Sequence, residues 1–256
     1  MQRFEYHQFL YGSDNYGVLV HDPDTGQTAA IDAGDGERYL KELQAKGWEL
    51  SHIFITHHHG DHTEGLEMMM SATGAISYGP AGDNPGHAHI QHQVREGDEL
   101  RFSGAVIDIY HTPGHTLDML NYYIADEGVC FTGDTLFALG CGRVFEGDFE
   151  MMWNSLKKLI ALPADTILYS SHEYTQANAA FALSVDPDNQ ALKDRAAEID
   201  ALRAADKPTV PSLLSVELAT NPFIRPSDPQ LRAHLNMAQA SDAEIFAEVR
   251  RRKDNF

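Results

Sequence analysis

The sequence predicts an α+β fold in which two β-sheets lie face to face under helices, followed by a helical C-terminal part. Three observations lead to this prediction. Short β-branched and aromatic runs bounded by Gly, Asp and Pro recur through the first two thirds of the chain. Segments with helical spacing of apolar residues separate some of these runs. Beyond residue 173 the runs give way to segments rich in Ala, Leu, Lys and Glu, so the layered part of the chain is expected to end there.

The elements follow in order along the chain. Three strands are expected over residues 4–10, 16–21 and 28–31, because Gly12-Ser13-Asp14 and residues 22–26 are turn sequences. Residues 35–46 have the apolar spacing of a helix that Gly47 would end, and a strand is expected over 52–55. A helix should follow residue 62, with Leu66, Met69 and Met70 turned inward as core residues.

Strands and turns are expected again over residues 76–132, with an alternating strand through His87 and His89. A helix over 149–161 and a strand over 166–169 complete the first part. We therefore expect one domain over residues 1–173 and a helical domain over 174–256. The second domain is interrupted before a closing helix over 241–253 by Pro208, Pro211, Pro222, Pro226 and Pro229.

The most informative motif is Thr56-His-His-His-Gly-Asp-His62, which directly follows the apolar run 52–55. His57 and His59 are two residues apart, so they point the same way from an extended chain, and Gly60 allows the turn that brings Asp61 and His62 around. Imidazole and carboxylate ligands suit zinc, iron or manganese. His58 faces the other way, so we expect it to have a structural role. Asp32 could hold this loop by hydrogen bonds, or could simply belong to a turn.

Further potential ligands follow other strand-like runs. His111-Thr-Pro-Gly-His115 follows the run 105–110, Gly133-Asp134 follows 128–132, and Ser170-Ser-His172 follows 166–169. Ligand sites in layered α/β proteins gather beyond the carboxyl ends of strands, so these four segments are expected to meet in one metal site.

The order of the motifs HHHGDH, TPGHT, FTGDTLF and SSHEYT resembles the metallo-β-lactamase superfamily, and within it the glyoxalase II branch, the hydroxyacylglutathione hydrolases. The similarity extends to the TNPFIR segment at 220–225 and to the RRRKD segment at 250–254. The resemblance implies an αββα sandwich with a C-terminal helical domain. It also implies two divalent metal ions per chain, with zinc favoured over iron and manganese.

The resemblance assigns His57, His59 and His115 to one metal, and Asp61, His62 and His172 to the second. Asp134 would bridge both ions and hold, with them, a bridging hydroxide that attacks a thioester carbon. The implied reaction converts S-D-lactoylglutathione to D-lactate and glutathione, a step of methylglyoxal detoxification. The chain contains no Gly-x-Ser-x-Gly sequence and no zincin motif, so nucleophilic serine chemistry has no support.

The resemblance places Arg143, Tyr174, Arg250 and Lys253 on the glutathione moiety. Arg250 and Lys253 are three apart on one helical face, but two cations at a helix C-terminus can also serve the helix dipole alone. The chain departs from the common family pattern at two positions, where Arg143 replaces Lys and Phe145 replaces Tyr. These changes would alter affinity for glutathione, because the hydrogen-bonding groups differ.

Composition limits the functional classes. The formal net charge of −19 argues against a nucleic-acid partner. No apolar stretch is long enough for a membrane span, and the N-terminus has no signal-peptide pattern. With only two cysteines, the chain is expected to be cytoplasmic, and a monomer is adequate. Two alternatives stay open: a binuclear-metal hydrolase of another thioester or a lactone, and a non-catalytic metal- or glutathione-binding protein.

Overall fold

The computed structural model describes residues 3–256 and divides the chain into two compact units. The first runs to His111 and resumes over Asp118–Gly133, whereas the second comprises Thr112–Leu117 and Asp134–Phe256. Each unit has its own core and is described separately here.

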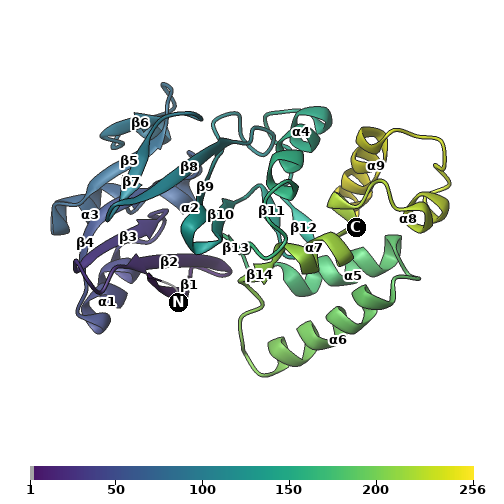
Figure 1. Cartoon of the computed structure of the whole chain (residues 1–256), viewed down its shortest axis with the longest axis horizontal. Coiled ribbons are helices and arrows are strands. Elements are labelled where there is room, and N and C mark those ends of the chain that lie inside the picture. The colour runs from purple at the N-terminus through teal and green to yellow at the C-terminus, as the bar shows by residue number, and fades with distance from the viewer. Residues whose placement is uncertain (1–2) are drawn as a thin grey trace. The chain divides into compact units, whose positions relative to one another are not determined.

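A six-stranded sheet in the order β1-β2-β3-β4-β5-β6 forms one layer of the first unit (Figure 1). Its strands are β1 (Glu5–Tyr11), β2 (Asn15–His21), β3 (Gln27–Ile31), β4 (Glu49–Phe54), β5 (Ile76–Pro80) and β6 (His92–Val94). The first three pair antiparallel, whereas β3 to β6 pair in parallel. Parallel neighbours end at the same edge of a sheet, so the segments that follow β3 and β4 lie together.

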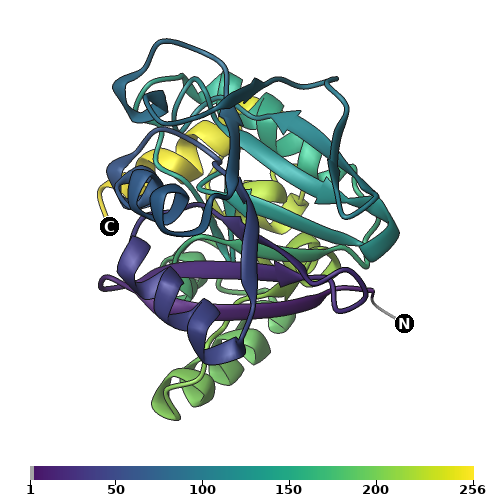
Figure 2. The same cartoon turned by 90° about the vertical axis from the view of Figure 1, so that its left-hand side faces the viewer.

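Helices α1 (Gly36–Lys46) and α3 (Leu66–Thr73) pack on this sheet (Figure 2). The Asp35 side chain caps the start of α1, and Gly47, with φ of 69°, ends it as the sequence predicts. Tyr39 and Met69 are fully buried in the core between the helices and the sheet. The short α2 (Gly60–Thr63) precedes α3.

A second layer of the first unit contains the antiparallel strands β7 (Leu100–Phe102), β8 (Ala105–His111), β9 (Leu120–Ile124) and β10 (Val129–Gly133). The two layers meet face to face, since the rings of Phe54 and Tyr122 lie 5.6 Å apart and the Tyr122 hydroxyl donates to the Ile55 carbonyl at 2.6 Å. Two 3-10 turns, η1 (Pro85–His87) and η2 (Ala125–Glu127), connect strands.

The expected strand through His87 and His89 is wrong. His87 ends η1 and His89 lies in a turn, because Pro85 and the Asn84 cap favour a tight turn over an extended chain.

The second unit is mostly helical. Its elements are β11 (Leu136–Phe137), β12 (Gly140–Cys141), α4 (Phe149–Ile160), β13 (Ile167–Ser170), α5 (Thr175–Val185), α6 (Gln190–Ala204), β14 (Ser212–Leu213), α7 (Leu214–Thr220), η3 (Pro222–Ile224), α8 (Pro229–His234) and α9 (Asp242–Asp254). Helices α4 and α9 pack together through the stacked rings of Trp153 and Phe246. Strand β14, which pairs with β13, was not predicted because two residues have no detectable periodicity.

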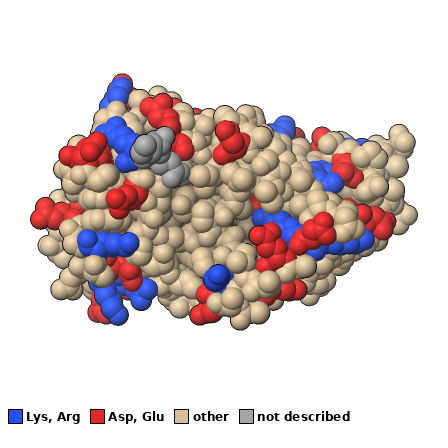
Figure 3. All heavy atoms as spheres, turned by 60° about the horizontal axis from the view of Figure 1, so that its bottom comes forward, with Lys and Arg blue, Asp and Glu red and all other residues tan. Residues whose placement is uncertain are grey.

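No helix in the described part of the chain combines the length and apolar character needed to cross a bilayer. On the face shown in Figure 3, acidic and basic side chains are interspersed, without a broad basic surface there.

A buried carboxylate in the first unit should make stability depend on acid. Burial alone would raise the pKa of Asp22, but hydrogen bonds from Ser103 and Arg3 outweigh it and lower the pKa to about 2 from 3.8. This stabilisation is fully present above pH 4 and is lost as the pH falls through 2. We expect Asp22→Asn to remove about 2 kcal/mol of acid-dependent stability. Denaturant unfolding between pH 5 and 2.5 measures it. Asp24→Asn is the control, and equal pH dependence in both variants would contradict the prediction.

Candidate metal centre

The loop that follows β4 carries the HHHGDH motif and is fastened to the end of β3. A Cβ atom on Gly34 would lie 1.8 Å from the Asp61 carbonyl oxygen, so only glycine permits this approach. The Tyr11 hydroxyl donates to the same oxygen at 2.8 Å, and the Ala33 amide donates to the His62 carbonyl at 2.8 Å. The loop is therefore held through its backbone.

Asp32 organises the side chains of this loop. It adopts a positive φ of 59°, and its carboxylate accepts from the Thr56 amide at 2.8 Å, the Thr56 hydroxyl at 3.0 Å and His62 Nδ1 at 2.8 Å. The sequence allowed Asp32 either to hold the loop by hydrogen bonds or simply to belong to a turn. The structure shows that it holds the loop. Because His62 donates its Nδ1 hydrogen to Asp32, the lone pair of its ring lies on Nε2.

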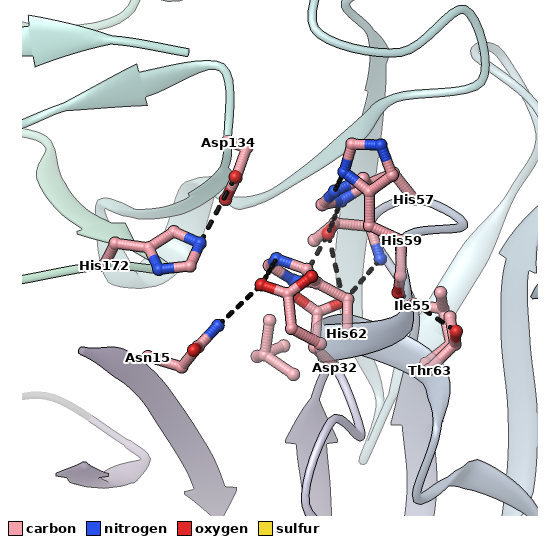
Figure 4. Close-up of polar contacts among 12 residues, drawn as sticks. Asn15, Asp32, Ile55, His57, His59, His62, Thr63, Asp134 and His172 are labelled. Atoms are coloured by element: carbon pink, nitrogen blue, oxygen red, sulfur yellow. Dashed lines mark hydrogen bonds and ion pairs between the residues drawn. The ribbon is translucent and has the colours of Figure 1, made fainter. Parts of the chain in front are cut away.

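The same reasoning fixes the tautomer of His57. The Thr56 hydroxyl donates to Asp32, so it accepts from His57 Nδ1 at 3.0 Å. The lone pair on His57 Nε2 then faces His59 Nδ1 at 3.0 Å. His62 Nε2 lies 3.4 Å from Asp61 Oδ2, to which Asn15 donates at 2.9 Å. Figure 4 shows Asn15 and His62 in this part of the site. The 3.4 Å between His62 and Asp61 suits donors about 2.1 Å from a shared cation, which stand about 3.4 Å apart in a tetrahedral site.

The second unit contributes a separate set of donors. His115 Nδ1 donates to the Arg143 carbonyl at 2.8 Å, so Nε2 is the atom it offers as a ligand. Asp134 Oδ2 lies 3.4 Å from this Nε2 and 3.3 Å from His172 Nε2, the latter pair visible in Figure 4. A Cβ atom on Gly142 would lie 2.0 Å from the Asp134 carbonyl oxygen, so the backbone at Gly142 packs directly against the backbone at Asp134.

The structure thus brings the predicted ligands into two sets, one in each unit. The first holds His57, His59, Asp61 and His62, and the second holds His115, Asp134 and His172. Their chemistry fits divalent metal ions, because neutral imidazole nitrogens and carboxylate oxygens converge in both sets. Asn15 and Thr56 were not singled out from the sequence, because no local pattern distinguishes them from ordinary polar residues.

The His58 ring contacts Asp118, with His58 Nδ1 3.0 Å from Asp118 Oδ1. The sequence analysis missed Asp118, since it lies outside every motif match.

The four residues predicted to contact glutathione all lie in the second unit. Tyr174 is partly exposed, and its ring stacks on His172 at 4.7 Å. Arg143 is exposed and pairs with Asp254 at 3.4 Å, and its guanidinium lies over the exposed Phe145. Lys253 Nζ lies 3.3 Å from the Ala177 carbonyl. Burial, and then the charge of Arg250, lower the pKa of Lys253.

Arg250, the fourth of these predicted contacts, is buried. Only 4% of this residue is exposed, and its guanidinium donates to the Cys141 carbonyl at 2.9 Å and to Asp254 at 2.8 Å. It therefore links α9 to β12. A helical position shows which face a residue takes, but not whether another segment covers that face.

Neither cysteine has the environment of a nucleophile. Both are buried, and burial raises the pKa of Cys141 to about 11, with Arg250 partly offsetting it. Burial also raises the pKa of Cys130.

Comparison with known proteins agrees with this geometry. Residues 12–172 match the metallo-beta-lactamase superfamily model, so the chain belongs to that superfamily. Residues 173–256 match the model of the hydroxyacylglutathione hydrolase C-terminus. The hydroxyacylglutathione hydrolase of Brucella ovis is 51% identical over 255 residues, covering 100% of this chain and 99% of the relative. Within the superfamily, the chain is a member of the hydroxyacylglutathione hydrolase family.

Solved structures confirm the predicted fold. ETHE1 from Myxococcus xanthus superposes with a TM-score of 0.69 at 25% identity, covering 96% of this chain and 90% of that one. TTHA1623, solved in a di-iron-bound form, superposes with a TM-score of 0.61 at 22% identity, covering 85% and 99%. The chain has the metallo-β-lactamase fold with an added helical C-terminal part.

Proposed function

We propose that this chain hydrolyses S-(2-hydroxyacyl)glutathione thioesters and converts S-D-lactoylglutathione to D-lactate and glutathione, in methylglyoxal detoxification. The observation behind this proposal is the 51% identity to a hydroxyacylglutathione hydrolase along the whole chain. The alternatives from the sequence, a lactone or another thioester as substrate, keep the same metal ligands.

We further propose that both ligand sets together bind two divalent ions, zinc by preference. His57, His59 and His115 would hold one ion, Asp61, His62 and His172 the other, and Asp134 would bridge them. Support comes from the tautomers: hydrogen bonds at Nδ1 of His57, His62 and His115 leave each Nε2 ready to bind a cation. When bound, two such ions make water a nucleophile near neutral pH and polarise a carbonyl.

The residues of the chain orient and hold the groups that react. The carboxylate of Asp32 keeps the proton on His62 Nδ1, so the ring cannot turn without losing a buried hydrogen bond. Departure of the product needs no general acid from the protein, because a thiol of ordinary pKa near 8.5 leaves as a thiolate. This explains how a site without a catalytic cysteine or serine can suit a thioester.

The C-terminal part supplies the groups for the glutathione moiety. We propose a catalytic domain over residues 1–173 and a substrate-binding domain over 174–256, in a monomeric cytoplasmic enzyme. Arg143 and Lys253 can reach a carboxylate of glutathione, whereas Tyr174 offers a ring and a hydroxyl beside His172. Arg250 contributes by holding Asp254, the partner of Arg143.

We expect Arg143→Ala combined with Lys253→Ala to raise KM for S-D-lactoylglutathione by at least about tenfold, with little change in kcat. The reason is that hydrogen bonds from charged groups contribute about 1.5–3 kcal/mol each to binding. Steady-state kinetics on a panel of glutathione thioesters, other thioesters and lactones measures this effect.

Lys193→Ala combined with Lys207→Ala removes two exposed cations elsewhere in the second unit and is the matched control. Failure of the metal-loaded protein to cleave any glutathione thioester would refute the proposed function. Faster cleavage of a lactone or an unrelated thioester would favour the alternative substrate instead.

A further inference from the structure

A second cluster of histidine and carboxylate lies in the first unit beside the metal loop. It contains His58 from the loop, His87 at the end of η1 and Asp118 just before β9. Asp118 Oδ1 lies 3.0 Å from His58 Nδ1, and Oδ2 lies 2.6 Å from His87 Nε2. The side chains are only 13%, 3% and 12% exposed for His58, His87 and Asp118, so these contacts are shielded from water.

The distances identify these contacts as hydrogen bonds. Two donors bound to one cation at about 2.1 Å stand about 3.4 Å apart, and the predicted ligand pairs of Asp134 match this at 3.3 and 3.4 Å. The 2.6 Å between His87 and Asp118 is too short for that arrangement and matches a charge-assisted hydrogen bond. Asp118 and His87 therefore contact each other directly.

Both ring nitrogens of His87 face oxygen atoms. Nε2 faces Asp118, and Nδ1 faces the Gly82 carbonyl at 3.3 Å. An imidazolium satisfies both acceptors, whereas a neutral ring satisfies one. Burial lowers the pKa of His87, but the hydrogen bonds to Asp118 and Gly82 outweigh burial and raise it. His87 thus anchors Asp118 through one carboxylate oxygen, and the other oxygen contacts His58 Nδ1.

The backbone of the metal loop is also packed tightly at His58. A Cβ atom on Gly86 would lie 2.3 Å from the His58 carbonyl oxygen, so η1 crosses His58 without space for a larger residue. The Leu120 amide, two residues beyond Asp118, donates to the Thr56 carbonyl at 2.8 Å. The segment 118–120 thus holds the metal loop at Thr56 through the backbone and at His58 through a side chain.

We propose that Asp118, anchored by His87, is a positioning residue for the metal centre: by fixing His58, it sets the directions of the neighbouring ligands His57 and His59. This inference rests on the proposed metal ligands. It gives a role to the one histidine of the motif that is not among the proposed ligands, and to two residues that the proposed reaction does not otherwise use.

Zinc affinity tests the inference without any substrate. Chelator competition on the full chain compares wild type with Asp118→Ala and Asp118→Asn, alongside Asp108→Ala as a control on the exposed side of β8. We expect Asp118→Ala to weaken zinc binding by about tenfold, the lower end of what groups that orient metal ligands contribute. Asp118→Asn, which keeps one acceptor, should recover part of it, and Asp108→Ala should change nothing.

Two further measurements separate positioning from other roles. The double variant His58→Ala and Asp118→Ala should bind zinc no more weakly than the weaker single variant, because both act through one contact. If the metal-free protein loses stability while zinc affinity stays unchanged, the inference is overturned. It is also overturned if wild type binds three zinc ions and Asp118→Ala two. His87→Gln replaces Asp118→Ala if that variant does not fold. If Asp118→Ala weakens zinc binding as expected but the wild-type protein has no thioesterase activity, only the proposed function is refuted.

Discussion

Replacing Asp134 by Ala is expected to lower kcat/KM for S-D-lactoylglutathione by at least about a thousandfold, which corresponds to about 4 kcal/mol of transition-state stabilisation. Asp134 is 6% exposed, and one of its oxygens is close to Nε2 of both His115 and His172. Without this carboxylate, the ion assigned to His57, His59 and His115 would have no anionic ligand, and the proposed bridge between the ions would be lost. Stopped-flow or steady-state kinetics with parallel metal analysis measures both effects.

Asp134→Asn separates charge from shape, because the amide keeps the volume and one acceptor but not the negative charge. We expect it to keep more metal than Asp134→Ala and still to lose most of the activity. Asp126→Ala, which removes an exposed carboxylate from η2, should retain wild-type kinetics and metal content. An Asp134→Ala protein with two metals per chain and near-normal kcat would exclude the bridging role.

Replacing Glu217 by Ala is expected to lower the free energy of unfolding by about 3–5 kcal/mol, the usual cost of breaking a buried ion pair from one side. Glu217 is fully buried and pairs with Arg195. It also accepts from the Leu139 amide at 2.9 Å and from Asn221 Nδ2 at 3.1 Å. Removing it takes the carboxylate away from the largely buried Arg195 guanidinium and leaves the buried Leu139 amide without its acceptor.

Denaturant unfolding of the metal-loaded protein measures the loss. Glu198→Ala on the exposed side of α6 is the matched control and should change stability by less than about 0.5 kcal/mol. Glu217→Gln should fall between the two, since it keeps the shape of the side chain without its charge. Equal stability of Glu217→Ala and Glu198→Ala would contradict the prediction and would mean that the site relaxes around the loss.

Much of the fold could be predicted from local patterns. The helix over Gly36–Lys46 follows from its apolar spacing and from Gly47, and strands β1 to β3 follow from runs separated by turn residues. The alternating strand through His87 was wrong because one proline and one cap outweigh a two-residue periodicity. Strand β14 was missed because it exists only through its pairing with β13.

The sequence by itself determined the chemistry of the candidate site. Seven potential ligands stand directly after strand-like runs, and the strand period explains why His58 faces away from His57 and His59. Tertiary structure alone decided that Asp118 contacts His58 and that Asp32 sets the tautomer of His62. It also decided that Arg250 is buried. The physical reason is range: ligand spacing follows from backbone geometry within a few residues, whereas hydrogen-bond partners and burial depend on segments that meet only when the chain folds.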